Sequence, residues 1–371
     1  MPQTLSRRNF FGTAAAAAAL PAAGALSAFA PVAMAASRAT SPRTLEEIRS
    51  MSPVQMARQS QPVQAAYRLL LTAAGTLRSG ELRTAVIGML KDPVPTIAQT
   101  DARKITEQLI ARGFCSPGTT NVFPENADPT FSPQPFWSAP GSGWTSHHAY
   151  PGGLATHVAY NVAVAMKMAD TYASVSGLVV DRDTAVGAEI LHDLHKPLVF
   201  QWQADGTCRT ERKLAKTGEH HVLSLAESMK RGLPAELVTA QACAHEHPGT
   251  AAGEALVVGW IECAAAIAGL DPEEEGYLAP GRRTLPLPRR TEGWLVHLAD
   301  HDFVLSSPAC RWSAEALEKL AQETYGIRDK TGQVALRNYA LCNLTAMRLY
   351  GILSARGRTA FAREVARLIK A

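Results

Sequence analysis

Residues 188–197 read AEILHDLHKP and place a histidine directly before an aspartate, His192-Asp193, at the end of a predicted helix. A neutral imidazole and a carboxylate side by side can both bind one divalent cation, and the second carboxylate oxygen stays free for another. All 11 histidines of the sequence fall between Trp144 and Asp302, and the long segments on either side have none. This distribution predicts one metal site built from several separate segments of the chain.

The composition is that of a folded, helical protein. The chain has 371 residues, 46% hydrophobic and 19% charged, which is enough for one large or two modest domains with a sizeable core. Aromatic residues make up 6% and alanine is abundant, which favours helices over a β-sandwich or barrel. The 6 cysteines are widely spaced without a Cys-x-x-Cys pair, which argues against a zinc ribbon and against a dithiol redox motif.

The first 35 residues have the features of an export signal. Residues 6–11, SRRNFF, precede an alanine-rich apolar run and a small-x-small cleavage site at Ala33-Met34-Ala35. The arginine pair and the apolar pair after it resemble the twin-arginine (Tat) signal. This resemblance implies passage through the Tat translocase, cleavage near Ala35, a periplasmic location and no membrane anchor after cleavage. An alanine-rich N-terminal helix or membrane anchor is the alternative interpretation.

The charge balance argues against a broad nucleic-acid surface. Without residues 1–35 the sequence has 35 basic and 33 acidic side chains, a net charge of +2. A chain so close to neutral has no extended positive patch for nucleic acid or anionic lipid. A polyanionic substrate would therefore be held locally, by a small number of groups.

Helical periodicity covers most of the chain after residue 36. Residues 36–112 are predicted as a helical N-terminal subdomain, interrupted at 92–95, with Thr100-Asp101 as a cap for the following helix. Further helices are expected from about residue 154 and over 183–194, 220–232, 236–247, 255–270, 294–305 and 312–371, the last as two or three helices. Pro197 is expected to stop the second of these. Because no segment shows the period-2 pattern of a strand, the sequence predicts an all-α fold.

Residues 113–146 differ from the rest. They are rich in proline, glycine, serine and aromatic residues, which predicts a long irregular segment. Irregular segments of this length are often functional. We expect a lid or wrap over the site, with a structural brace as the alternative.

Some of the candidate ligands have ordinary explanations and others do not. Three histidines are expected to be core residues or helix caps: His195, His297 and His301. Asp302 is expected to be solvated. Asp300, however, lies in an otherwise apolar helix, where an unpaired carboxylate would be costly. A cation held together with His157, His192 and Asp193 would compensate it.

The segment from about Trp144 to Leu305 resembles the HD-domain metal-dependent phosphohydrolase superfamily, whose pattern is a His, a His-Asp pair and a distant Asp. YPGGLATH supplies His157, EILHDLHKP supplies His192 and Asp193, and VHLADHD supplies Asp300. The resemblance implies an HD-domain helical bundle over 147–306, with residues 36–112 as an N-terminal helical extension and 307–371 as closing helices.

Part of that superfamily has two metals. For that version, the resemblance implies His221 and His245 as ligands of a second ion, with His220 and His247 as local alternatives and Asp193 as the bridging carboxylate. Two divalent ions are expected, and the sequence does not choose among Fe, Mn, Zn, Ni, Co and Mg. The cyclic-dinucleotide branch has a Gly-Tyr-Pro signature where this chain reads PGT at 248–250, so that substrate is not implied.

The ligand set predicts activation of a water and binding of phosphoryl oxygens. Asp193 is expected at the reaction centre, and Lys196 is placed to bind phosphate, or alternatively to complement a helix dipole. His147 and His148 are candidates for binding the phosphate or for general acid catalysis, and His148 is the one we assign to catalysis. Weaker candidates of the same kind are Arg209, Arg212 and Lys213.

The predicted function is a periplasmic metal-dependent phosphohydrolase acting on a small phosphate ester: a phosphomonoester, a nucleotide or a phosphodiester. An HD-fold di-iron oxygenase is the alternative, because it would use the same kind of His and Asp ligands. A non-catalytic metal-binding HD domain is a third possibility.

Overall fold

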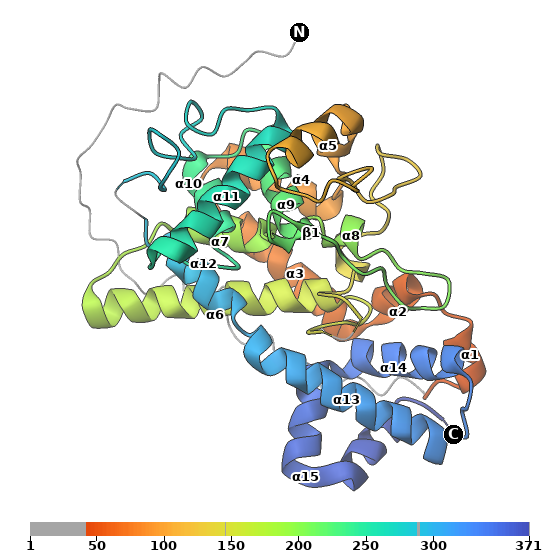
Figure 1. The fold of residues 1–371 in the computed structure, drawn as a ribbon. Coiled ribbons are helices and arrows are strands. Elements are labelled where there is room, and N and C mark those ends of the chain that lie inside the picture. Colours follow the sequence, from red (N-terminus) through yellow and green to blue (C-terminus); the bar gives the residue numbers. More distant parts are fainter. Residues whose placement is uncertain (1–41, 145, 288–289, 371) are drawn as a thin grey trace. The chain divides into compact units, whose positions relative to one another are not determined.

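The computed structural model describes residues 42–144, 146–287 and 290–370, and helices make up nearly all of their regular structure (Figure 1). In these residues the named strands are β1 (Lys213–Leu214) and β2 (Thr217–Gly218), which form a two-stranded antiparallel pair. The predicted all-α fold is therefore confirmed. The predicted Tat signal over 1–35, with its cleavage point near Ala35, lies outside the described residues.

The N-terminal part consists of short capped helices. They are α1 (Leu45–Arg49), α2 (Pro53–Gln59), α3 (Gln61–Gly75), α4 (Gly80–Lys91), the 3-10 turn η2 (Thr96–Gln99) and α5 (Ala102–Ala111). Ser52 caps α2 in a capping box with Gln55, and the Asp101 side chain caps α5, which the sequence predicted. The expected break at 92–95 separates α4 from η2.

The central helices carry the histidines. They are α6 (Gly153–Ser176), α7 (Arg182–Leu191), α8 (Lys196–Val199), α9 (Glu219–Lys230), α10 (Ala235–Ala242), α11 (Ala251–Ala268) and α12 (Glu292–Asp300). Helix α6 packs against α3, α7 and α12, and α9 packs against α10 and α11. By length and composition alone α11 would pass as a membrane span, but 61% of it is buried within the fold, as in the core helix of a bundle.

Three predicted helix ends are wrong, and all lie near candidate ligands. Helix α10 ends at Ala242, five residues before the predicted end at His247, so His245 lies in the turn after it. Helix α7 ends at Leu191 with His192 as its C-cap, three residues before the predicted end. Pro197 does not stop that helix but lies in the first turn of α8, where a missing N–H costs nothing. Helix α12 ends at Asp300, and a new helix begins at Phe303, where the sequence predicted one continuous helix. The ligand candidates therefore lie at helix ends, where the backbone changes direction.

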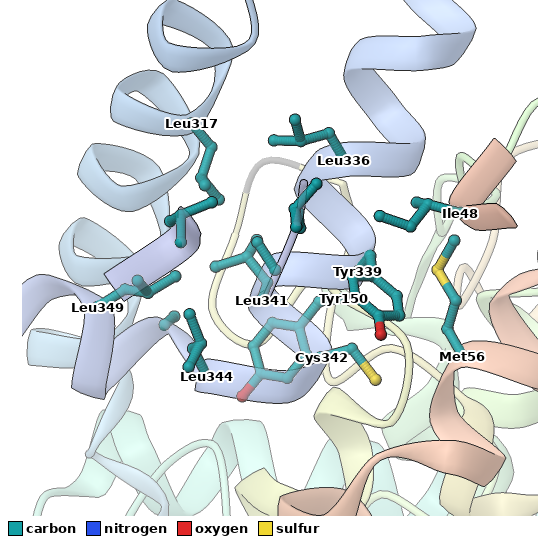
Figure 2. Packing of buried hydrophobic residues seen from close by; sticks show 14 of the residues in the cluster. Ile48, Met56, Tyr150, Leu317, Leu336, Tyr339, Leu341, Cys342, Leu344 and Leu349 are labelled. Atoms are coloured by element: carbon teal, nitrogen blue, oxygen red, sulfur yellow. The ribbon is translucent and has the colours of Figure 1, made fainter. Parts of the chain in front are cut away.

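The C-terminal helices α13 (Phe303–Glu323), α14 (Lys330–Leu344) and α15 (Ala346–Ala366) pack against one another. Figure 2 shows their buried side chains, such as Leu317 and Leu349, in one cluster with Ile48 and Met56 from α1 and α2. Backbone hydrogen bonds join Arg43 to Leu368 and Lys370, so both ends of the described chain lie together. The C-terminal helices thus share a core with the first two helices.

The irregular segment 113–146 contains the 3-10 turn η3 (Phe136–Ser138) and is tied to the region of α8. The Gln134 side chain donates to the Phe200 carbonyl, and the Trp202 indole donates to the Ser138 carbonyl. Lys196 at the start of α8 donates to the carbonyl of Gly141. The segment therefore lies over the turn that follows His192-Asp193.

Candidate metal centre

Four side chains, from α6, from the turn after α7 and from the end of α12, point their ligand atoms at one place. His157 Nε2 lies 3.2 Å from Asp193 Oδ2 and 3.2 Å from Asp300 Oδ1. His192 Nε2 lies 3.2 Å from the same Asp193 oxygen and 3.4 Å from the same Asp300 oxygen. All four side chains are buried. These are the four residues expected for the first metal.

These spacings fit a single divalent ion. Two atoms that each lie about 2.1 Å from one ion are about 3.0 Å apart at a right angle and about 3.4 Å apart at a tetrahedral angle. In the described part of the chain, His192 Nε2 and Asp193 Oδ1 are buried without a hydrogen-bond partner, while Asp193 Oδ2 forms an ion pair with Lys196. Buried polar atoms normally have such a partner, so this cluster suits a cation that would satisfy them.

The charges of the cluster also favour a cation. Burial alone would raise the pKa of Asp193, but His192 and Lys196 hold it well below its usual range. Burial would lower the pKa of His157, but Asp193, Asp300 and Asp302 raise it to about 10. The carboxylates thus draw positive charge to this place, which a divalent ion can supply.

Asp193 turns its second oxygen toward another group. Its Oδ1 lies 3.3 Å from His220 Nε2. The ring centroids of His220 and His245 are 5.2 Å apart. Ligand atoms of Asp193, His220 and His245 lie within 4.8 Å of one another, and His245 Nε2 lies 3.8 Å from Asp300 Oδ2. One oxygen of Asp193 therefore faces each group, which is the arrangement a bridging carboxylate needs.

The neighbouring histidine lies elsewhere. The ring of His221 stacks on His245 at 4.2 Å and meets the edge of Trp260 at 4.9 Å. It is absent from the ligand-type groups found among the described residues, whereas His220 belongs to one. The structure therefore favours His220, the local alternative, over His221 as the partner of Asp193.

Outer carboxylates orient two of the histidines. Glu211 Oε2 lies 2.6 Å from His220 Nδ1, and Asp302 Oδ1 lies 3.4 Å from His157 Nδ1. A carboxylate on the second ring nitrogen fixes the tautomer and direction of a ligand histidine. Glu211 is not among the candidates predicted from the sequence, and no spacing signal marks it. The prediction that Asp302 is solvated is wrong, because its side chain is 6% exposed and faces His157.

Lys196 points into the site. Its Nζ lies 2.6 Å from Asp193 Oδ2, and the residue is only 2% exposed. It is the first residue of α8, the end at which a cation does not complement the helix dipole. The lysine therefore contacts the carboxylate that both groups share.

Glycines make room for the two histidines that precede α6. A Cβ at Gly153 would lie 1.8 Å from the His148 carbonyl oxygen, and one at Gly141 would lie 2.5 Å from His148 Cβ. His147 and His148 consequently lie beside His157, with ring centroids 4.7 and 5.2 Å from its ring. Burial lowers the pKa of His148 to about 3, so its imidazole is neutral at pH 7. The role of His148 as a general acid remains a prediction.

Of the three weaker phosphate candidates, the two arginines make contacts away from the ligand groups. Arg212 pairs with Glu219 and donates to the carbonyls of Asn121 and Val122. Arg209 lies 3.7 Å from Glu125 and donates to its carbonyl. Lys213 is exposed in β1. The two arginines hold the irregular segment in place, and neither contact involves the ligand groups.

The comparisons with known proteins give one informative relative. Over 99 residues the chain is 35% identical to a dihydroneopterin 2',3'-cyclic phosphate phosphodiesterase of Methanocaldococcus jannaschii. The aligned part is 27% of this chain and spans 39% of that protein, well under two thirds of its length. No family model and no solved structure matches the chain. The chain thus has a distant relative that is a phosphodiesterase.

Proposed function

We propose that this protein is a metal-dependent hydrolase of small phosphate esters. The observation that carries the proposal is the position of Asp193, which turns one oxygen to a group with His157, His192 and Asp300 and the other to His220. Paired divalent sites of this kind are used for phosphoryl chemistry. The phosphodiesterase relative supports the same class of substrate.

The first ion would be held by His157, His192, Asp193 and Asp300, and the second by Asp193, His220 and His245. Bound divalent ions would supply Lewis-acid chemistry, polarising a phosphoryl oxygen and lowering the pKa of a water. A donor set rich in imidazole suits transition-metal ions better than Mg²⁺. We therefore place Fe, Mn, Zn, Ni and Co ahead of Mg among the expected metals.

The other residues of the site position these groups and the substrate. Lys196 forms an ion pair with Asp193 and donates to the Gly141 carbonyl, which holds the shared carboxylate and offsets part of its charge. Nδ1 of His147 and of His148 has no hydrogen-bond partner in the described chain, and both rings lie beside the first group. In the proposed reaction these two neutral imidazoles hydrogen-bond to the phosphate ester.

A periplasmic location, reached through the Tat translocase, belongs to the same proposal. Its support is the sequence of residues 6–35. Export of the folded, metal-loaded chain would let the protein take up its metal in the cytoplasm. Fractionation of cells that express the full chain, with an Arg7→Lys, Arg8→Lys variant as the comparison, tests the location separately from the activity.

The activity is tested by metal analysis and a substrate panel. The purified chain is assayed against cyclic and acyclic phosphodiesters, nucleotides and phosphomonoesters, before and after chelation and after reconstitution with each candidate metal. We expect His192→Ala and Asp193→Ala to lose bound metal and turnover together, while Asp128→Asn, an exposed loop carboxylate, keeps both.

Each contrary result has a distinct meaning. Full turnover after complete metal removal would refute the metal-dependent hydrolase. Consumption of O2 by the iron-loaded protein, without ester cleavage, would assign the oxygenase alternative. Bound metal without turnover on any of these substrates would favour a non-catalytic metal-binding domain.

A further inference from the structure

A third cluster of ligand-type side chains lies outside the two groups that share Asp193. Ligand atoms of Glu246, His247 and His297 all lie within 4.8 Å of one another. The ring of His301 lies 4.0 Å from that of His297, and His247 lies 5.0 Å from it on another side. Three imidazoles and a carboxylate thus gather at one place to which the proposed hydrolysis assigns no role.

The cluster is built from two chain segments that also contribute to the metal centre, the turn after α10 and the end of α12. Different side chains of each segment face the two places. In the turn after α10, His245 faces the Asp193 group while His247, two residues later, faces His297. At the end of α12, Asp300 faces the metal centre while His297 lies against His247. Each segment therefore offers side chains to both places.

Two of the imidazoles already have the tautomer that metal binding requires. His297 Nδ1 is 3.1 Å from the Ala244 carbonyl oxygen, and His301 Nδ1 is 2.6 Å from the His297 carbonyl oxygen. A carbonyl can only accept, so each Nδ1 carries the proton and each Nε2 carries a lone pair. Backbone carbonyls commonly hold ligand histidines in this way.

We propose that Glu246, His247 and His297, with His301 beside them, bind a further transition-metal ion of the Zn²⁺ type. Two imidazole nitrogens and one carboxylate oxygen form a three-residue set that suits such an ion, with a fourth position left for water. The ion ties the turn after α10 to the end of α12, the segments that carry His245 and Asp300. Its binding does not depend on ester hydrolysis.

The side chains that must move to close this site are partly exposed, and each accepts one hydrogen bond from a backbone amide. Ligands around one tetrahedral ion are about 3.4 Å apart, so ligand atoms that are now up to 4.8 Å apart move closer by up to about 1.4 Å on binding. The side chains of Glu246 and His247 are 31% and 37% exposed, while His297 is buried. The Gly249 amide donates to His247 Nδ1 at 3.1 Å, so His247 turns its ring away from this amide to present a lone pair to the ion.

The test counts metal equivalents in the full-length chain. Protein stripped by chelation is titrated with Co²⁺, followed by its visible absorption, and with Zn²⁺, followed by metal analysis after dialysis. We expect Glu246→Gln and His247→Ala each to bind one equivalent fewer than the unmodified chain. Both side chains are partly exposed, so these variants are expected to keep their fold, which circular dichroism checks. Glu323→Gln on the exposed face of α13 is the matched control.

Asp193→Asn separates this ion from the metal centre. Under the proposal this variant loses ions from the groups that share Asp193 but keeps the equivalent that Glu246→Gln removes. The proposal would be overturned if His247→Ala bound as many metal equivalents as the unmodified chain. It would also be overturned if the ion were lost on dialysis, or if Asp193→Asn removed the same equivalent. The number of bound metal equivalents does not depend on whether an ester is hydrolysed. The metal proposal and the hydrolase proposal can therefore fail separately.

Discussion

The contact between Glu211 and His220 leads to the most direct test of the second ligand group. Glu211 Oε2 lies 2.6 Å from His220 Nδ1, while His220 Nε2 faces Asp193 Oδ1 at 3.3 Å. Glu211→Gln keeps the shape of the side chain but removes the charge that strengthens this hydrogen bond. Loss of such an outer partner costs about 10-fold to 100-fold in metal affinity or activity, or about 1.4 to 2.8 kcal/mol. We expect Glu211→Gln near the lower value and Glu211→Ala near the upper one.

Gly218→Ala disturbs the same contact without altering either partner. A Cβ at Gly218 would lie 2.2 Å from Glu211 Oε2, so the carboxylate has to move. The backbone of Gly218, at φ −66° and ψ 140°, accepts alanine without strain, so a loss of affinity would act through Glu211. Both changes disrupt the same contact. The double variant should therefore bind the second ion no less tightly than whichever single variant has the lower affinity.

The assay is competition for Co²⁺ or Mn²⁺ between the protein and a chromophoric chelator, with turnover measured alongside once a substrate is known. Glu125→Gln, whose side chain is 95% exposed, is the control and should match the unmodified chain. If Glu211→Gln and Gly218→Ala both bind the second ion within about twofold of the unmodified chain, Glu211 does not orient His220, and the argument from outer carboxylates fails.

Two further predictions concern Asp302 and Glu227. Asp302→Asn should lower the affinity for the first ion by about 10-fold to 100-fold, because the Asp302 carboxylate faces His157 Nδ1. If the variant retained metal on dialysis as well as the unmodified chain does, Asp302 would have no role in the site. Glu227 is buried, which raises its pKa, but hydrogen bonds from His195 and Thr96 bring the pKa down to about 2 from an ordinary 4.5. The resulting stabilisation is present above pH 4.5 and is lost as the pH falls toward 2, so Glu227→Gln should cost up to about 3 kcal/mol at pH 7 and flatten the pH dependence in urea unfolding. Equal unfolding free energies of the two proteins at pH 7 would contradict this.

The sequence predicted the helical fold and the four residues that meet in the first group. Helical periodicity is a local signal, and it survives in the observed helices even where their ends shift by several residues. Asp300 stood out because a carboxylate in an apolar helix requires compensation, and the structure places it 3.2 Å from His157. The shifted ends at Leu191 and Asp300 could not be predicted, since the turns after them are fixed by tertiary contacts.

The choice between His220 and His221 shows where sequence reasoning stops. Neighbouring residues on a helix point about 100° apart, so only one of them can face Asp193. The apolar pattern normally tells which side of a helix faces the core, but every residue of α9 from Glu219 to Met229 is buried. Such a helix has no polar face from which its rotation can be read. Its rotation is set by packing against α10 and α11, and Glu211, two residues before β1, then contacts His220. A ligand that depends on such a contact between side chains can be identified only once the fold has brought the two together.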